Sequence, residues 1–192
     1  MTTLQFKTAS LFGGAISVDI PQTWADVSEI REVPDTQEVY LDRDGFSSIV
    51  VDILERVDKP TDGEALEYHL SDIIDEDLGE AKIRERKDAS LRLMPSTPVF
   101  TLIATTPPGA RQRGRPNEPD FVGVIMILIR LKEQKTDIVV TVNVPHLPNS
   151  YDENEMTPEE GKLGPLMESA SKVKERVLDT FEVKDFGLFI EE

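Results

Sequence analysis

Apolar and polar residues alternate along much of the chain in short runs that have the length of β-strands. In the first third, strands are expected on either side of a Gly13-Gly14 turn, and a hairpin at 39–57 is expected to turn at Asp44-Gly45. The segment 26–37 between them predicts an irregular loop with a helical start, because a proline interrupts it. Apolar residues then recur at helical spacing over 62–76, which predicts an amphipathic helix.

The second half of the chain continues with strands and ends in a helix. Strands are expected at about 81–93 and 98–106, followed by a mobile loop at 107–119 that is rich in proline, glycine and arginine. The run at 121–129 is apolar throughout, which indicates a strand buried on both faces. A stripe of apolar residues from Leu163 to Phe181 predicts a long C-terminal helix.

Strands in hairpin order, rather than strands that alternate with helices, favour an α+β fold. We expect a single domain over 1–192 with an antiparallel, about six-stranded β-sheet flanked by helices on both faces, since the strand at 121–129 needs cover on each side. A chain of this length can bury one sizeable core. No exposed heptad pattern indicates self-association, so a monomer is expected.

Negative charge is concentrated in one part of the chain. The 192 residues include 21 Lys and Arg against 37 Asp and Glu, a formal net charge of −16. Residues 19–80 alone hold 19 acidic and four basic side chains. Apolar positions interrupt this acidic stretch throughout, which indicates an acidic face on a folded body. Such a field disfavours binding to nucleic acid and suits a basic partner.

The residue types that most often carry enzyme chemistry are scarce. With no cysteine, the chain offers no thiol nucleophile and no thiolate metal site. Of its two histidines, His69 lies on the apolar stripe of its helix, so a hydrogen-bonded core histidine is favoured over a catalytic one. His146 is interpreted as an ordinary loop residue. Because nucleotide-binding, hydrolase and metalloprotease motifs are absent, we expect no enzyme activity, no cofactor and no metal.

No targeting or membrane segment is expected. The first residues lack the charged and apolar regions of a signal peptide. The longest apolar stretch, at 121–129, is short beside the roughly 20 residues that a membrane helix needs. These features favour the cytosol or the nucleus and no contact with a membrane.

The segment 26–55 carries the most informative polar residues. It combines an acidic loop around Pro34 with a strand, IVVDILE, in which Asp52 and Glu55 interrupt an apolar run. A carboxylate is costly to bury without a partner, so Asp52 is expected to face solvent, a partner or a bound cation. From the residues alone, a merely solvated sheet edge explains the pattern equally well.

The same segment resembles the Ran guanine-nucleotide release factor family, known for the Mog proteins. The most distinctive stretch is DVSEIREVPDTQEVY at 26–40. Further matches follow in the family's order at 11–21, 48–58, 65–73, 128–131 and 136–145. The matches cover most of the chain, and the departures from the family pattern lie at 107–119 and 146–162. The resemblance implies an antiparallel sheet flanked by helices, similar to the photosystem extrinsic protein PsbP.

Members of that family bind the small GTPase Ran, release its nucleotide and support nuclear protein import. The resemblance therefore implies Ran as the partner in its GTP-bound and nucleotide-free forms, a further Ran-binding protein as a candidate second partner, and a location in the nucleus with some cytoplasmic protein. It assigns Ran binding to two acidic loop residues and two strand residues, which are Asp35, Glu38, Asp52 and Glu55. Three more residues share the motif and its surface: Asp26, Glu29 and Arg31. The alternative is an acidic scaffold or adaptor that binds a basic partner without releasing nucleotide.

Overall fold

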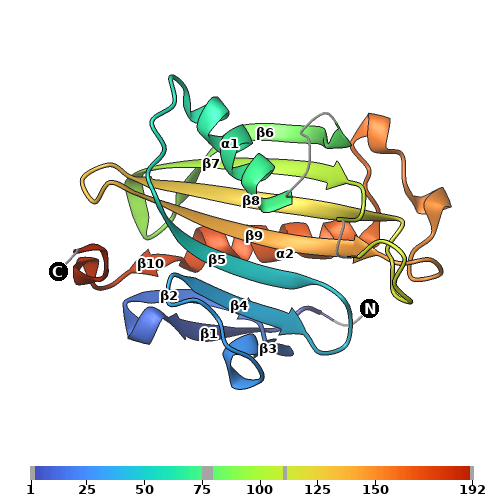
Figure 1. Cartoon of the computed structure of the whole chain (residues 1–192), viewed down its shortest axis with the longest axis horizontal. Coiled ribbons are helices and arrows are strands. Elements are labelled where there is room, and N and C mark those ends of the chain that lie inside the picture. The colour runs from blue at the N-terminus through green and yellow to red at the C-terminus, as the bar shows by residue number, and fades with distance from the viewer. Residues whose placement is uncertain (1–2, 75–79, 110–111, 191–192) are drawn as a thin grey trace.

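Strands make up most of the computed structural model, which describes residues 3–74, 80–109 and 112–190. A small antiparallel sheet contains β1 (Phe6–Leu11), β2 (Ile16–Pro21) and β10 (Glu182–Val183). A larger one contains β3 (Trp24–Asp26), β4 (Gln37–Asp42), β5 (Ser48–Glu55), β6 (Lys82–Leu91), β7 (Met94–Thr106), β8 (Phe121–Leu131) and β9 (Thr136–His146). Its seven strands follow the order β3-β4-β5-β9-β8-β7-β6, and all neighbours run antiparallel (Figure 1).

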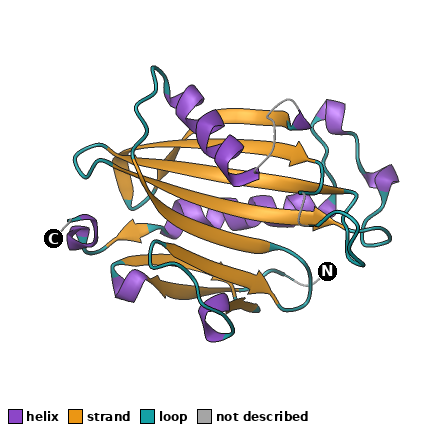
Figure 2. Ribbon diagram, in the orientation of Figure 1, coloured by secondary structure: helices purple, strands orange, loops and turns teal. Residues whose placement is uncertain are grey.

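Two α-helices lie on opposite faces of the large sheet, α1 (Asp62–Ile74) in front and α2 (Pro165–Thr180) behind (Figures 1 and 2). A reciprocal pair of hydrogen bonds starts α1, from the Thr61 N–H to the Glu64 carboxylate (3.2 Å) and from the Glu64 N–H to the Thr61 hydroxyl (3.1 Å). Both predicted helices are confirmed, although residues 75 and 76 lie outside the described range. No helix in the described parts of the chain is long and apolar enough to span a membrane.

The short helices within the described residues are of the 3₁₀ type. They are η1 (Phe12–Gly14), η2 (Val27–Glu29), η4 (Glu153–Glu155), η5 (Pro158–Glu160) and η6 (Phe186–Phe189). The first of them forms the turn between β1 and β2, where Phe12, Gly13 and Gly14 all have positive φ angles. Glycine adopts this backbone region without the strain that a side chain causes, which explains the Gly-Gly pair.

The strand β8 is apolar at nearly every position because it faces a hydrophobic core on each side. Alternate residues join the core beneath α2 (Ile125, Ile127 and Ile129) and the core beneath α1 (Val124, Met126 and Leu128). On the α2 side, Val173 and Val177 belong to the same core, and Leu166 packs against it. The structure therefore confirms a central strand at 121–129 with a helix on either face.

The structure contains more strands than the sequence pattern predicted. The strands β3 and β10 have only three and two residues, which is too short for an alternating pattern to show. The helical start expected near residue 26 is present as η2, directly after β3. His146, interpreted as a loop residue, instead ends β9 and is 1% exposed, with its ring stacked on Phe121 at 4.0 Å between centroids.

The arginine- and proline-rich segment 107–119 connects β7 to β8. Its described part is built from successive turns, with hydrogen bonds from the Gln112 N–H to the Gly109 carbonyl (2.8 Å) and from the Arg115 N–H to the Gln112 carbonyl (3.3 Å). Residues 110 and 111 lie outside the described range. The mobility of this loop stays a prediction.

Replacing Ile127 with Ala tests whether β8 is the centre of both cores. Ile127 is fully buried, so the change leaves a cavity and should lower the free energy of unfolding by about 2–5 kcal/mol. The matched control is Ile190→Ala, since Ile190 is 74% exposed and should change stability by less than about 0.5 kcal/mol. Denaturant unfolding of both variants measures the difference, and equal effects would contradict the placement of β8.

Candidate functional site

The acidic motif, residues 26–40, begins at the end of β3, continues through the loop between β3 and β4, and ends within β4. Asp26 ends β3, and its carboxylate accepts a hydrogen bond from the Ser28 N–H (2.8 Å), which starts η2. Glu29, Arg31 and Asp35 follow in the loop and are exposed. With the exposed Glu32, the loop thus presents three acidic side chains and one basic side chain to solvent.

Glu38 was expected in this loop, but the structure places it within β4. It is paired with Val51 of β5, and its carboxylate accepts a hydrogen bond from the Phe12 N–H (2.7 Å) in the turn of the small sheet. The backbone becomes a strand from Gln37 onward because it pairs with β5 there. Glu38 therefore connects the two sheets and is not a freely exposed loop residue.

Three of the motif carboxylates gather around Tyr40. Burial is the largest cause that raises the pKa of the Tyr40 phenol to about 12, and the charges of Asp26, Glu38 and Glu29 add to it. The side chain of Tyr40 belongs to the core beneath α2. These three acids therefore create a negative field on the side of the sheet that faces the small sheet.

Asp52 lies on the opposite face of the large sheet. Its neighbour on β9 is Val139, which belongs to the core beneath α1. Its cross-strand partner on β4 is Gln37, whose side-chain amide donates a hydrogen bond to the Asp52 carboxylate (2.7 Å). Glu55 is exposed at the end of β5, three residues along. The predicted residues are thus divided between two faces.

A groove of about 370 Å³ lies beside Asp52, between α1 and the strands β5 and β9. Its polar lining residues are Gln37, Asp52, Asp72, Thr141 and Asn143. Asp72, Thr141 and Asn143 were not predicted from the sequence. The only signal for Asp72 was its position one turn after His69 on the predicted helix, which is not specific enough to select it.

Burial is the largest cause that raises the pKa of Asp52 above its ordinary value. The negative charge of Asp72 acts in the same direction, while the hydrogen bond from Gln37 and the charge of His69 oppose both. Folding therefore holds this carboxylate where its ionised form is disfavoured. Such a group gains most from a cationic partner that reaches it.

A second groove of about 390 Å³ continues along the segment that joins β5 to α1. Glu55, Asp58 and Asp72 line it, together with Tyr68 and Lys59, whose ammonium lies 4.7 Å from the centre of the Tyr68 ring. Tyr68 is 47% exposed. Within residues 3–74, 80–109 and 112–190, no group of three or more His, Asp or Glu side chains could hold a metal ion.

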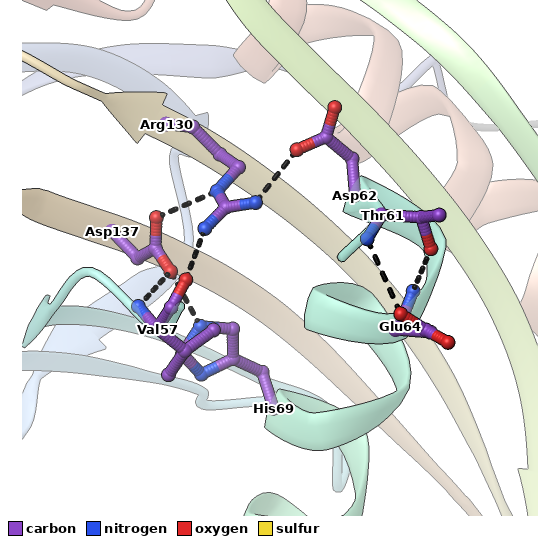
Figure 3. Close-up of polar contacts among 7 residues, drawn as sticks. All are labelled: Val57, Thr61, Asp62, Glu64, His69, Arg130 and Asp137. Atoms are coloured by element: carbon purple, nitrogen blue, oxygen red, sulfur yellow. Dashed lines mark hydrogen bonds and ion pairs between the residues drawn. The ribbon is translucent and has the colours of Figure 1, made fainter. Parts of the chain in front are cut away.

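A buried network around Asp137 joins α1 to the large sheet (Figure 3), and α1 contributes lining residues to both grooves. The Asp137 carboxylate accepts hydrogen bonds from His69 Nε2 (2.8 Å), the Val57 N–H (3.1 Å) and Arg130 Nε (3.1 Å). The other guanidinium nitrogens of Arg130 donate to Asp62 and to the Val57 carbonyl, both at 2.6 Å. The network connects β8, β9, α1 and the segment before α1, and it confirms the interpretation of His69 as a hydrogen-bonded core residue.

The protonation of Asp137 follows from the balance of these contacts. Burial alone would raise the pKa of Asp137. The hydrogen bonds from His69 and Val57 and the charge and hydrogen bond of Arg130 outweigh burial, so the pKa of Asp137 is lowered. Asp137 is 0% exposed and Arg130 is 3% exposed, so both charges are satisfied by protein contacts rather than by solvent.

A family model described as "Ran-interacting Mog1 protein" matches residues 9–145, which include the whole acidic motif, both groove-lining strands and α1. This chain is a member of the Mog1 family. Membership confirms the resemblance of the motif at 26–40. The family match ends before the segment 146–162, which was identified as a departure from the pattern, and before α2.

Two Mog1 relatives show how far the likeness extends. The nuclear import protein MOG1 of Saccharomyces cerevisiae is 35% identical over 150 residues, which cover 72% of this chain and 66% of the yeast protein. A probable Ran guanine nucleotide release factor of Dictyostelium discoideum is 26% identical over 200 residues, which cover 96% of this chain and 97% of that protein.

Solved structures agree with the fold. The crystal structure of the S. cerevisiae Ran-binding protein Mog1p matches with a TM-score of 0.73 and 27% identity, over 98% of this chain and 100% of the yeast chain. Cyanobacterial PsbP from Synechocystis matches with a TM-score of 0.53 over 95% of this chain and 94% of its own. At 12% identity, the second match shows the fold alone and confirms the PsbP-like architecture.

Replacing Asp137 with Asn tests the network. The change removes the buried carboxylate opposite Arg130 and leaves this cation only its ion pair with the partly exposed Asp62, so the free energy of unfolding should fall by about 3–5 kcal/mol. The control is Asp88→Asn, which removes an exposed carboxylate from β6 and should stay within about 0.5 kcal/mol of the unchanged protein. Equal stabilities of the two variants would contradict the role of Asp137.

Replacing Asp52 with Asn should instead increase the free energy of unfolding at neutral pH. Because the pKa of Asp52 is raised, the folded protein binds this proton more tightly than the unfolded chain, and the free energy of unfolding falls as the pH rises between the two pKa values. At neutral pH the ionised carboxylate therefore reduces stability, so the variant should unfold at a higher temperature than the unchanged protein. The difference in melting temperature between the two proteins should shrink as the pH falls below both pKa values of Asp52. A lower melting temperature of the variant at neutral pH would refute this reading.

Proposed function

We propose that this protein binds the small GTPase Ran, promotes release of its bound guanine nucleotide and thereby supports nuclear protein import. Membership of the Mog1 family over residues 9–145 is the observation that carries the proposal. The names of the relatives support it, because they describe a nuclear import protein and a Ran guanine nucleotide release factor. The protein would act as a GTPase regulator and not as an enzyme, with the chain 1–192 working as one Ran-binding domain.

We assign the contact with Ran to the acidic residues of the loop and of β5. Asp35, Asp52 and Glu55 form no ion pair with any described residue, so their charges are available to a partner. Asp26 ends β3 before the same loop, and Glu29 and Arg31 lie within it. Glu38 supports this surface indirectly, because its carboxylate fixes the turn at Phe12.

The electrostatics of the GTPase explain how such a surface could release nucleotide. A P-loop GTPase holds GTP through backbone N–H groups, a lysine on the phosphates and a Mg²⁺ ion. Carboxylates that approach this site compete for the lysine or weaken the Mg²⁺ site, and they thereby favour the empty state. Release requires that the protein bind empty Ran more tightly than loaded Ran, since equal affinities shift no equilibrium.

The acidic segment 19–80 adds a long-range effect. Its 19 acidic and four basic residues attract a basic surface and increase the rate of encounter. Salt screens this attraction, because the Debye length is only about 8 Å at physiological ionic strength.

We further propose a location in the nucleus with part of the protein in the cytoplasm, where a nucleocytoplasmic carrier cycle would need it.

Charge reversal separates the roles of loop and strand. Asp35→Lys should slow nucleotide release, whereas Asp52→Lys and Glu55→Lys should weaken binding to GTP-loaded Ran at least about tenfold, because attraction to basic groups becomes repulsion. Titration of labelled Ran and release of labelled GTP, each at low and moderate salt, measure both effects. Circular dichroism melts confirm that each variant is folded.

The control is Asp88→Lys, which makes the same charge change on β6, at the far edge of the sheet. It should bind Ran almost as the unchanged protein does. If Asp35→Lys, Asp52→Lys and Glu55→Lys also behave like the unchanged protein, the assignment of the site is wrong. If the unchanged protein binds Ran but releases no nucleotide, the acidic scaffold is the correct function.

A further inference from the structure

A third pocket, of about 330 Å³, lies at the end of the large sheet where β6 and β8 begin and β7 ends. The segment between β9 and α2 lies at the same end of the sheet and contributes Met156 and Pro158 to the lining (Figure 1). The pocket shares no lining residue with the two acidic grooves, and β9, β8 and β7 separate β5 from β6 in the sheet. It is therefore a separate candidate site.

Two cationic side chains of β6 line this pocket. Lys82 is exposed and forms no ion pair with any described residue. Arg84 donates from Nε to the Thr105 hydroxyl (3.2 Å) and from Nη1 to the Glu159 carboxylate (3.3 Å). The side chain of Glu159 is 89% exposed, so this ion pair contributes little. Both cations are therefore available to an anionic ligand.

The backbone of β6 is irregular at Arg84. Ile83 pairs with Ala104 and Glu85 pairs with Ile103, so Arg84 is the extra residue of a β-bulge. Bulges reorient a side chain relative to the regular alternation of a strand, and they are frequent next to binding and active sites. This bulge accompanies the placement of the Arg84 guanidinium beside Thr105, in the lining of the pocket.

The part of the chain that surrounds the pocket is basic, in contrast to the rest. Residues 81–115 hold eight basic and two acidic side chains, whereas residues 19–80 hold four basic and 19 acidic ones. Because the Debye length is about 8 Å at physiological ionic strength, charges close to the pocket act on a ligand more strongly than the distant acidic segment. This end of the sheet therefore suits an acidic partner.

The walls of the pocket are largely apolar and are held in place by packing. Pro107, Met156 and Pro158 contribute apolar surface together with Phe121. The ring of Phe121 stacks on His146 at 4.0 Å between centroids and meets the edge of the Tyr151 ring at 5.6 Å. An apolar side chain of the ligand could pack against this preformed wall.

Two carboxylates in the lining limit the charge of the ligand. Glu80 is paired with Arg113 at 3.7 Å, and Asp120 accepts a hydrogen bond from the Tyr151 hydroxyl (2.9 Å). Both would repel a doubly charged phosphate more strongly than a singly charged carboxylate. The pocket therefore favours the carboxylate of an aspartate or glutamate over a phosphate group.

The edge of the sheet next to the pocket can align an extended chain. The strand β6 is the last of the large sheet, and no described strand pairs with its outer edge. Such an edge offers backbone groups to an extended segment of another protein. In an extended segment, residues two positions apart point to the same side, so an acidic and an apolar side chain can enter the pocket together.

We propose that this pocket binds an extended acidic segment of a second partner protein, with one carboxylate at Lys82 and Arg84 and an apolar side chain two residues away against Phe121 and Met156. The proposal goes beyond the binding of Ran, because the site uses other residues of the opposite charge. It also gives a role to parts of the segments 107–119 and 146–162, which depart from the family pattern.

Nuclear magnetic resonance of the methionine methyl groups tests the proposal in the full chain. The probe is a capped pentapeptide, Ser-Glu-Ser-Leu-Ser. It should shift the methyl resonance of Met156, which lines the pocket, and leave those of Met94, at the start of β7, and Met126, fully buried beneath α1, unchanged. Replacing the glutamate of the peptide with glutamine should weaken binding about fivefold. Replacing its leucine with serine should weaken binding about tenfold.

Charge reversal of Lys82 has a matched control. Lys82→Glu should weaken binding of the peptide about tenfold, because attraction to its carboxylate becomes repulsion. Since Lys82 is exposed and forms no described ion pair, the variant should melt like the unchanged protein. Lys132→Glu makes the same change in the turn between β8 and β9, at the opposite end of these strands, and should leave the affinity within about twofold.

Four results would overturn the proposal. They are an unshifted Met156 resonance at saturating solubility of the peptide, equal affinities for the glutamate and glutamine peptides, equal affinities of Lys82→Glu and Lys132→Glu, and displacement of the peptide by inorganic phosphate that binds more tightly. The last result would show that the pocket is a phosphate site. No step uses Ran, so the outcome is independent of the proposed function.

Discussion

The buried carboxylate of Asp137 is the interaction on which the arrangement of the site depends. It accepts hydrogen bonds from β8 through Arg130, from α1 through His69, and from the segment between β5 and α1 through Val57. Arg130 also contacts Asp62 at the start of α1. Because α1 carries Asp72 and β5 carries Asp52, the network determines how far apart the two acidic walls of the groove stand.

Two carboxylates close to each other in the sheet show how the same side chain can serve stability or binding. Asp137 on β9 pairs in register with Leu54 of β5, two residues from Asp52. Asp137 has three hydrogen-bond donors that lower its pKa, whereas Asp52 has one amide donor and a pKa that burial raises. The first carboxylate is satisfied within the fold. The second is held in a less favourable state, which is expected of a binding residue that gains a partner.

The elements with long, regular patterns could be predicted from the sequence. The apolar run at 121–129 indicated a central strand, and the helical spacing at 62–76 indicated α1, because burial imposes these patterns over many residues. The face of Glu38 could not be predicted, since it depends on the register of β4 with β5 and on the turn at Phe12. The groove could not be predicted either, because Asp72 and Thr141 are distant in the sequence and meet only through the position of α1.

The motif itself was informative about the family and less so about the geometry. The stretch at 26–40 is distinctive enough to indicate the Mog proteins, and the family model agrees. However, the acidic residues that the resemblance assigned to Ran binding fall on two faces of the sheet, with Asp26, Glu29 and Glu38 around Tyr40 and Asp52 beside α1. Residues that are close in sequence therefore have different tasks, and of these four acids only Asp52 lines the groove.

The most direct test of the account is a comparison of affinities for two states of Ran. Isothermal titration of the protein with nucleotide-free Ran and with GTP-loaded Ran, under one salt condition, gives the two dissociation constants. The account predicts tighter binding to the empty state, by about tenfold or more, because a release factor can shift the equilibrium only through such a difference. Equal affinities for the two states would contradict it.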